Sequence, residues 1–254
     1  MAQPLLADRD GRGTVTTEAI EIRGGVELPA RREDIELHTR DGLTLVGELA
    51  VPVQNEPVAT LVTLHPLPTA GGFMDSHIIR KLAARMPALA DLAVLRFNTR
   101  GTDSPRGTSE GTFGEGIDEE YDLDAAMDFV AERSLPHPWL VGWSFGTEVA
   151  LLYGRDHPVD GAILLSPPLK RVTPAQVSDW AGDPRKLVAI IPEFDDYLRP
   201  DAARRAFASV PDIDLVSVAG GKHLWVGETQ TRRVLTEILE RVNPRALPMP
   251  TRWA

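Results

Sequence analysis

The stretch Gly142-Trp143-Ser144-Phe145-Gly146 determines how the rest of this chain is interpreted. It follows a short apolar run that ends at Val141, and it precedes a run compatible with a helix, Thr147 to Tyr153. A serine between two glycines in a sharp strand-to-helix turn predicts a nucleophile elbow, whose strained backbone lifts the hydroxyl clear of the sheet. A side chain at either glycine would collide with the neighbouring strand or helix. Such a pentapeptide also occurs by chance, so the interpretation depends on the surrounding sequence.

Length and composition limit the possible classes of protein. The chain has 254 residues, of which 43% are hydrophobic and 25% charged, as expected for one α/β domain with a large core. Its net charge of −10 argues against nucleic acid or an anionic membrane as a partner. The absence of cysteine excludes disulfides, a thiolate nucleophile and cysteine-based zinc sites. Because the first residues do not resemble a signal peptide and no apolar run approaches membrane-spanning length, we expect a cytoplasmic protein.

The order of apolar runs predicts strands that alternate with helices. Strands are expected at residues 35–39, 43–49, 59–64, 93–97, 139–141, 161–165, 186–191 and 214–218. Helices are expected at 75–86, where Pro87 ends or kinks the helix, and at 118–130, 147–153, 202–208 and 228–241. This alternation predicts an α/β fold with an eight-stranded, mostly parallel sheet and helices on both faces. The chain enters the sheet through an antiparallel hairpin at Asp41-Gly42.

The domain organisation predicted from these runs is simple. Residues 1–30 are expected to form an N-terminal tail, or an edge strand around residues 15–22. Residues 31–243 form a single domain, and the Pro-rich residues 244–254 form a C-terminal tail. The span 166–185, where a lid would be inserted, is long enough only for a small flap with one helix near Pro174 to Trp180.

A nucleophilic serine needs a histidine base and an acid that orients the histidine. In an elbow fold the chain order is serine, acid, histidine, and His223 lies in a loop between the last strand and the last helix. Three carboxylates follow the preceding strand. Asp195 is favoured, because its position leaves room for a tight turn back toward His223, while Asp196 is the second candidate and Glu193 could also reach.

Two backbone N–H groups are needed to stabilise an oxyanion. The elbow supplies the backbone N–H of Phe145. The loop after residues 59–64 supplies a second N–H group, which we assign to Leu67, between Pro66 and Pro68. His65 is expected to brace this loop.

Substrate binding and metal binding are less well indicated. Six side chains are candidates for lining a pocket, although each is equally compatible with ordinary packing: Phe73, Met74, Trp143, Trp180, Tyr197 and Trp225. No cationic clamp for a carboxylate or phosphate is apparent. The acidic cluster at residues 118–124 is interpreted as a solvated first helical turn in preference to a metal site, so no metal is expected.

The chain resembles the α/β-hydrolase superfamily, and more narrowly the small, nearly lidless bacterial serine hydrolases related to dienelactone hydrolases and acyl-peptidase-type enzymes. The resemblance rests on segments that occur in the same order as in the family. They are His65-Pro66 with Gly71-Gly72, Arg96-Phe97-Asn98 with Arg100-Gly101, the pentapeptide at 142–146, Asp195 and Gly221-Lys222-His223. It implies that Ser144 is the nucleophile, Asp195 the acid and His223 the base, with Leu67 and Phe145 as oxyanion donors. Two departures are Pro192, where the family has glycine, and Leu67, where relatives often have histidine.

The function predicted from these residues is hydrolysis of a carboxylic ester or thioester through an acyl-enzyme on Ser144, of the carboxylesterase type and without a cofactor. Acyl transfer or peptide hydrolysis by the same triad are alternatives, as is a noncatalytic binding protein that retains the fold. A small-molecule acyl substrate is the expected partner of a monomer or homodimer, with no nucleic acid and no membrane.

Overall fold

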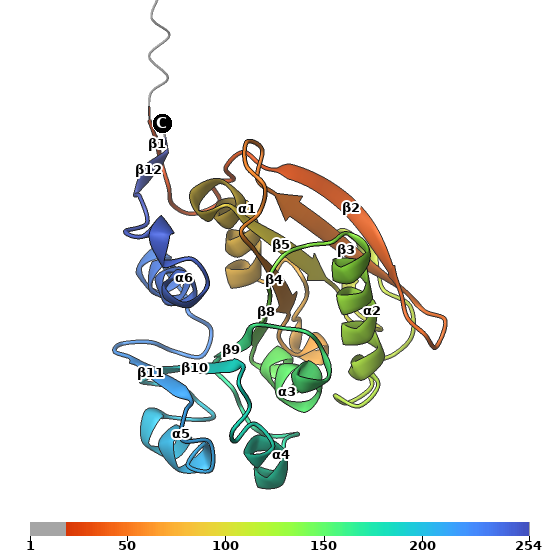
Figure 1. The fold of residues 1–254 in the computed structure, drawn as a ribbon, viewed down its shortest axis with the longest axis vertical. Helices are drawn as coiled ribbons and strands as arrows, with labels where there is room; N and C mark the ends of the chain where they lie inside the picture. The colour runs from red at the N-terminus through yellow and green to blue at the C-terminus, as the bar shows by residue number, and fades with distance from the viewer. Residues whose placement is uncertain (1–18, 254) are drawn as a thin grey trace, which may run out of the picture.

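An eight-stranded sheet runs through the middle of the molecule (Figure 1). The computed structural model describes residues 19–253. In chain order the strands of the sheet are β2 (Arg31–His38), β3 (Thr44–Val51), β4 (Ala59–Leu64), β5 (Leu92–Phe97), β8 (Pro138–Trp143), β9 (Gly161–Leu165), β10 (Lys186–Pro192) and β11 (Asp214–Val218). Their order across the sheet is β11-β10-β9-β8-β4-β5-β3-β2. This sheet confirms the predicted α/β architecture.

The directions of the strands also agree with the prediction. The five strands β4, β8, β9, β10 and β11 are parallel, and β5 runs parallel to β4. The hairpin of β2 and β3 is antiparallel, and β3 is antiparallel to β5. Gly42 in the hairpin turn has φ 90°, a backbone conformation that favours glycine. The carboxyl ends of the parallel strands therefore meet at one edge of the sheet, where a site is expected.

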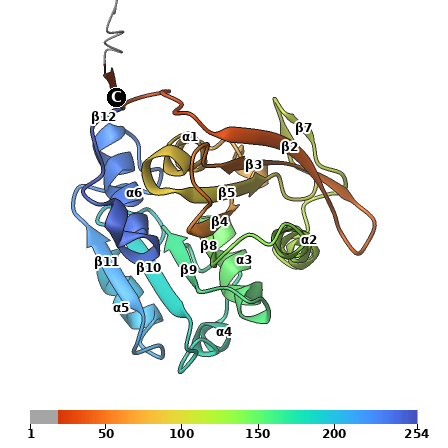
Figure 2. The ribbon, with the colours of Figure 1, turned by 45° about the horizontal axis from the view of Figure 1, so that its top comes forward.

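Helices cover both faces of the sheet (Figure 2). They are α1 (His77–Ala90), α2 (Glu119–Glu132), α3 (Phe145–Tyr153), α4 (Pro174–Ser178), α5 (Pro200–Ala206) and α6 (Glu228–Val242). Helices α1 and α6 pack on one face, and the other four pack on the opposite face. The side chains of β4 alternate between the two cores, with Leu61 in one and Val62 in the other. The helix expected in the short flap is α4.

Helix α1 continues through Pro87 to Ala90, so of the two expected effects of this proline, an end or a kink, the end of the helix is wrong. A proline inside a helix removes the hydrogen bond to the carbonyl four residues earlier. Here that carbonyl belongs to Ala83, and it accepts a hydrogen bond from Arg32 Nη2 at 3.1 Å. The neighbouring carbonyl of Ala84 accepts from the N–H of Leu28 at 2.8 Å. Because the chain before β2 and Arg32 at its start supply replacement donors, the helix tolerates the proline.

Two members of the acidic cluster at the start of α2 are not solvated, contrary to the prediction. Glu119 and Asp122 are fully buried. The Glu119 carboxylate accepts hydrogen bonds from the N–H groups of Gly114 and Gly116 at 2.9 and 2.7 Å. Asp122 accepts from the backbone and side chain of Arg100. These two carboxylates thus hold the loop before α2, and within residues 19–253 no group of three acidic or histidine side chains is arranged to hold a metal ion.

The two ends of the described chain lie against each other. The short strand β1 (Ile20–Glu21) pairs antiparallel with β12 (Arg252–Trp253), which follows the 3₁₀ turn η3 (Pro244–Ala246). Met249, between η3 and β12, is buried against the α1 and α6 side of the sheet. Residues 15–18 of the expected edge strand lie outside the described residues. No helix within residues 19–253 has the length and apolar composition needed to cross a membrane.

Candidate active site

The elbow forms where β8 passes into α3, with Ser144 as the residue between them. Ser144 has φ 51° and ψ −116°, a strained conformation for a residue with a side chain. A Cβ on Gly142 would overlap the carbonyl of Gly146, and a Cβ on Gly146 would overlap the carbonyl of Leu64 in β4. The two glycines are therefore required because helix and strand approach each other at backbone distance. The turn leaves Ser144 partly exposed at the carboxyl edge of the sheet.

The loops after β10 and β11 bring an acid and a histidine to this serine. His223 Nε2 lies 2.9 Å from Ser144 Oγ, and His223 Nδ1 lies 2.9 Å from Asp195 Oδ2. An ionised carboxylate can only accept, so Nδ1 carries the proton, and Nε2 is free to accept one from the hydroxyl. Asp195 and His223 are 2% and 7% exposed, which shields their hydrogen bond from water. The structure thus brings the three predicted triad residues into one hydrogen-bonded chain.

The environment of Asp195 favours its ionised form. Burial alone would raise the pKa of Asp195, but the hydrogen bond from His223 and those from the N–H groups of Leu198 and Tyr197 outweigh it and lower that pKa. The two N–H groups donate to Oδ1 at 3.0 and 2.7 Å. This arrangement leaves Oδ2 for the imidazole and keeps a negative charge beside it.

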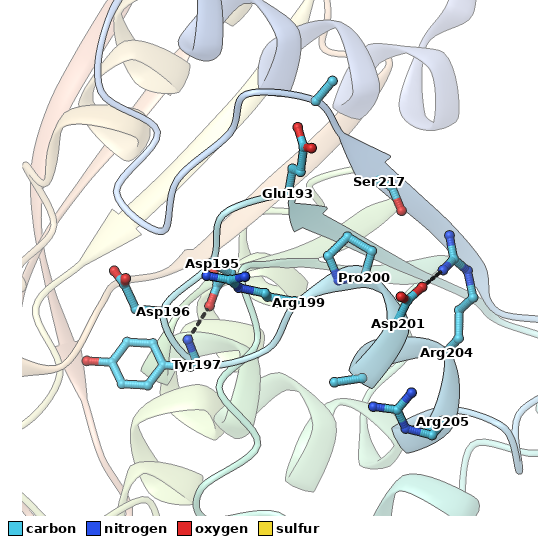
Figure 3. Close-up of a pocket in the computed structure, with 12 residues that line it drawn as sticks. Glu193, Asp195, Asp196, Tyr197, Arg199, Pro200, Asp201, Arg204, Arg205 and Ser217 are labelled. Carbon is cyan, nitrogen blue, oxygen red and sulfur yellow. Dashed lines mark hydrogen bonds and ion pairs between the residues drawn. The ribbon is translucent and has the colours of Figure 1, made fainter.

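The other two carboxylates of this loop do not reach His223. The Asp196 side chain is exposed and points away from Asp195 (Figure 3). Glu193 accepts a hydrogen bond from the N–H of Gly220 at 2.8 Å and so braces the loop that carries the histidine. Both line a wide cleft of about 750 Å³ behind the acid loop, whose lining includes neither Ser144 nor His223. That cleft is larger than the cavity at the serine and borders Asp195, but the serine and the histidine base lie outside it.

The backbone of the histidine loop is held from β8 and β9. Trp143 Nε1–H donates to the carbonyl of His223 at 3.2 Å, and Ser166 Oγ donates to the same oxygen at 3.3 Å. Trp143 is next to the nucleophile in the chain, so the elbow and the base are held by one side chain. The sequence placed Trp143 among possible pocket residues and gave no sign of this second role.

The two predicted oxyanion donors both lie in the lining of the cavity at Ser144. Within the described chain, neither the N–H of Leu67 nor that of Phe145 donates a hydrogen bond to another residue. The carbonyl of Leu67 accepts from the N–H groups of Ala70 and Gly72 at 3.0 Å each, so the loop turns back on itself. Both amide groups are therefore available to a bound oxyanion.

His65 fastens the loop that presents Leu67. Its Nδ1–H donates to the carbonyl of Pro66 at 2.7 Å. Its Nε2 accepts from the N–H of Thr99 at 3.0 Å and lies 3.1 Å from the Thr99 hydroxyl. Burial lowers the pKa of His65 from 6.5 to about 4, so the ring is neutral. This geometry agrees with a bracing role for His65.

A cavity of about 150 Å³ opens at the serine. Of the six predicted lining residues it contains Trp143 and Tyr197, and the Tyr197 ring meets the His223 ring edge-on at 4.6 Å. Its other walls come from the loop after β4 that presents Leu67, the elbow, the residues after β9 and the loop that carries His223. They are Pro66, Leu67, Ala70, Ser144, Phe145, Glu148, Pro168, Lys170, Arg171, His223 and Leu224.

The other four predicted lining residues do not line this cavity. Trp180 is buried behind α3, where its Nε1–H donates to the carbonyl of Leu151 at 2.9 Å. Trp225 is fully buried in the core beneath α6. Met74 is fully buried, with its N–H bonded to Asn98 Oδ1, and Phe73 is half-buried outside the lining. Three of the four are therefore packing residues.

The structure also places two cations at the cavity that the sequence did not indicate as a pair. Lys170 and Arg171 lie in its lining together with Glu148, which is fully buried on α3. Charged residues that follow a strand in an irregular loop carry no periodic signal, so no sequence pattern identifies them. Their proximity to Ser144 depends on how the loop after β9 folds over the elbow.

Comparison with known sequences gives a partial match. No protein-family model matches the chain. An uncharacterised protein of Rickettsia prowazekii is 30% identical over 121 residues, 46% of this chain, and the match spans about half (48%) of that relative's length.

Solved structures match over most of the chain. An α/β serine hydrolase homologue from Coxiella burnetii has a TM-score of 0.69 at 24% identity, over 82% of this chain and 96% of that one. A serine hydrolase without lid from Xanthomonas campestris has a TM-score of 0.68 at 26% identity, over 88% and 99%. An esterase of Pyrococcus furiosus has a TM-score of 0.65 at 19% identity, over 84% and 93%.

Proposed function

We propose that this chain, which belongs by its fold to the α/β-hydrolase superfamily, is a serine hydrolase that cleaves a carboxylic ester or thioester through an acyl-enzyme on Ser144. The observation that carries the proposal is the hydrogen-bonded chain from Ser144 through His223 to Asp195. Its arrangement beside two unused backbone N–H groups matches what acyl transfer requires. The serine hydrolase and esterase names of the similar structures support the same class of reaction.

The proposed first half of the reaction forms the acyl-enzyme. His223 Nε2 takes the proton of Ser144 Oγ as the oxygen attacks the carbonyl carbon, and the charge on the carbonyl oxygen is stabilised by the N–H groups of Leu67 and Phe145. The imidazolium is stabilised by Asp195. When the tetrahedral intermediate collapses, the bond to the alcohol or thiol breaks, and His223 gives that leaving group its proton.

The proposed second half releases the acid. A water molecule gives a proton to His223 Nε2 and attacks the acyl carbon. The same two N–H groups stabilise the second oxyanion, and the ester bond to Ser144 breaks as His223 returns the proton to the serine oxygen. The enzyme ends in its starting state, and the product is a carboxylic acid.

The proposed substrate class follows from the reactivity of the bond to be cleaved and from the size of the cavity at Ser144. Esters and thioesters are favoured over amides because their leaving groups depart more easily. The cavity of about 150 Å³ is small, and of the span 166–185 only Pro168, Lys170 and Arg171 line it, while the five-residue helix α4 does not. We therefore expect the enzyme to accept short or chain-end acyl groups, with longer groups extending into solvent.

The test is turnover of a series of p-nitrophenyl esters from acetate upward. The wild-type protein should release p-nitrophenol, and Ser144→Ala should lower kcat by at least about a thousand-fold. Ser209→Ala, a change at an exposed serine after α5, is the matched control and should retain wild-type rates. Equal turnover by wild type and Ser144→Ala, or none by either across the series, would overturn the proposal.

A further inference from the structure

The mouth of the cavity at Ser144 carries a cation in a protein whose net charge is −10. Lys170 lies in the loop after β9, and it lines the same small cavity as the nucleophile and the base. The residue is exposed, so its ammonium group is available to whatever enters the cavity.

The backbone of this loop is anchored to the elbow helix. The Glu148 carboxylate, fully buried one turn after Ser144, accepts hydrogen bonds from the N–H groups of both Lys170 and Arg171, the second at 2.7 Å. A buried carboxylate with several charge-assisted hydrogen bonds holds its partners rigidly. The Lys170 backbone is therefore fixed relative to the serine.

The two neighbouring cations have different partners. Arg171 Nη1 contacts Glu148 at 3.3 Å and its Nη2 contacts Glu115 at 3.2 Å, so its charge is compensated. The Lys170 ammonium forms no ion pair with any residue in the range 19–253. It lies 4.1 Å from the centroid of the Tyr197 ring. A cation–π contact holds an ammonium group in place but, unlike a carboxylate, leaves its charge uncompensated.

The remaining charges near the cavity leave this positive charge unopposed. Glu148 is shared between Arg171 and two backbone N–H groups, and Asp195 is bonded to His223. Asp196, on the same loop as Tyr197, lines the neighbouring cleft and not this cavity. Tyr197 in turn meets the His223 ring edge-on, so the cation, the aromatic ring and the base lie in sequence along one wall.

We propose that Lys170 is a specificity-determining residue, and that the enzyme prefers esters or thioesters that carry an anionic group, such as a carboxylate, near the scissile carbonyl. This inference rests on the proposed hydrolase function. The ammonium group attracts the anionic end of the substrate while Ser144 attacks the carbonyl. Because the site is partly open to water, the effect of one such charge is modest, on the order of fivefold in kcat/KM.

The test compares two substrates of equal length, one anionic and one neutral. One is the mono-p-nitrophenyl ester of adipic acid, and the other is the neutral p-nitrophenyl ester in which the free carboxyl is an amide. The wild-type ratio of kcat/KM, anionic over neutral, should exceed one and fall as salt is added. Lys170→Ala should lower the ratio by about fivefold, and Lys170→Glu by about 25-fold, because attraction becomes repulsion.

The matched control is Lys186→Glu, which changes the net charge equally at an exposed lysine at the opposite end of β10. It should leave the ratio at its wild-type value, and thermal unfolding should show that all variants are folded. Equal ratios in Lys170→Glu and Lys186→Glu, or a wild-type preference for the neutral ester, would refute the role of Lys170 while leaving the hydrolase proposal standing. A wild type that cleaves p-nitrophenyl acetate but neither of these two esters would refute the inference alone, whereas a wild type that cleaves no p-nitrophenyl ester would refute the hydrolase proposal.

Discussion

Mildly acidic pH should destabilise the protein, because the unfolded chain binds a proton at His65 that the folded protein resists. The ring is 1% exposed and neutral, with its pKa lowered by burial from 6.5 to about 4. Its Nε2 accepts from the N–H of Thr99, and a protonated ring would place a second N–H against that donor. Protonation therefore costs both desolvation of a charge and a hydrogen bond.

The size and sign of the effect follow from linkage. Between pH 6.5 and about 4 the unfolded chain binds a proton at His65 that the native protein does not, so the free energy of unfolding falls as pH falls through this window. A shift of this size corresponds to about 3 kcal/mol in total, of which roughly 2 kcal/mol is expressed between about pH 7 and about pH 4.5.

The assay is urea unfolding of the wild type and His65→Gln at these two pH values. Glutamine retains an acceptor for Thr99 but has no proton to gain, so the wild type should lose about 2 kcal/mol more than the variant on acidification. His38→Gln, at an exposed histidine on β2, controls for removal of an imidazole and should follow the wild type. Parallel pH profiles for the wild type and His65→Gln would refute the reasoning.

Three further predictions concern the elbow and the acid. Gly146→Ala places a Cβ on a backbone carbonyl of β4, so it should destabilise the fold by at least about 2 kcal/mol. The measurement is thermal unfolding, in which the variant should have a lower Tm. An unchanged Tm would mean that helix and strand are farther apart at the elbow than described. Asp195→Asn should lower kcat by about 10⁴-fold, because Asp195 orients the imidazole. Asp196→Asn changes an exposed side chain and should keep wild-type activity. A loss of activity in Asp196→Asn but not in Asp195→Asn would assign the role of the acid to Asp196. The pKa of Asp195 is lowered in the fold, so the stability that its charge contributes should be present above pH 3.8 and be lost at lower pH. The difference in unfolding free energy between the wild type and Asp195→Asn should therefore shrink below pH 3.8.

The parts of the fold and site that sequence predicts are those with a local pattern. Alternating apolar runs identify the eight strands, and two glycines at fixed spacing identify the elbow, since both patterns are visible within a few consecutive residues. Chain order and position together selected His223, because His157 and His223 follow Ser144 and only His223 comes directly after a late strand. Asp195 was favoured by its distance from the strand end, and the structure places that residue against the imidazole.

What sequence did not predict depends on contacts between distant segments. Pro87 stays in its helix because Arg32, far away in the chain, bonds the carbonyl that it frees. Trp180 and Trp225 are core residues, a distinction that aromatic composition cannot make. Lys170 reaches the cavity because a buried carboxylate on α3 holds its loop, and neither residue stands in a recognisable motif.

The central claim is that Ser144 is an activated nucleophile. The most direct measurement is the intact mass of the protein after incubation with a fluorophosphonate, followed by peptide mapping. The account predicts one covalent adduct, located on Ser144, which is lost in Ser144→Ala and slowed strongly in Asp195→Asn, because the imidazole then loses the carboxylate that orients it. A folded wild-type protein that forms no adduct, or forms one on another residue, would contradict the account.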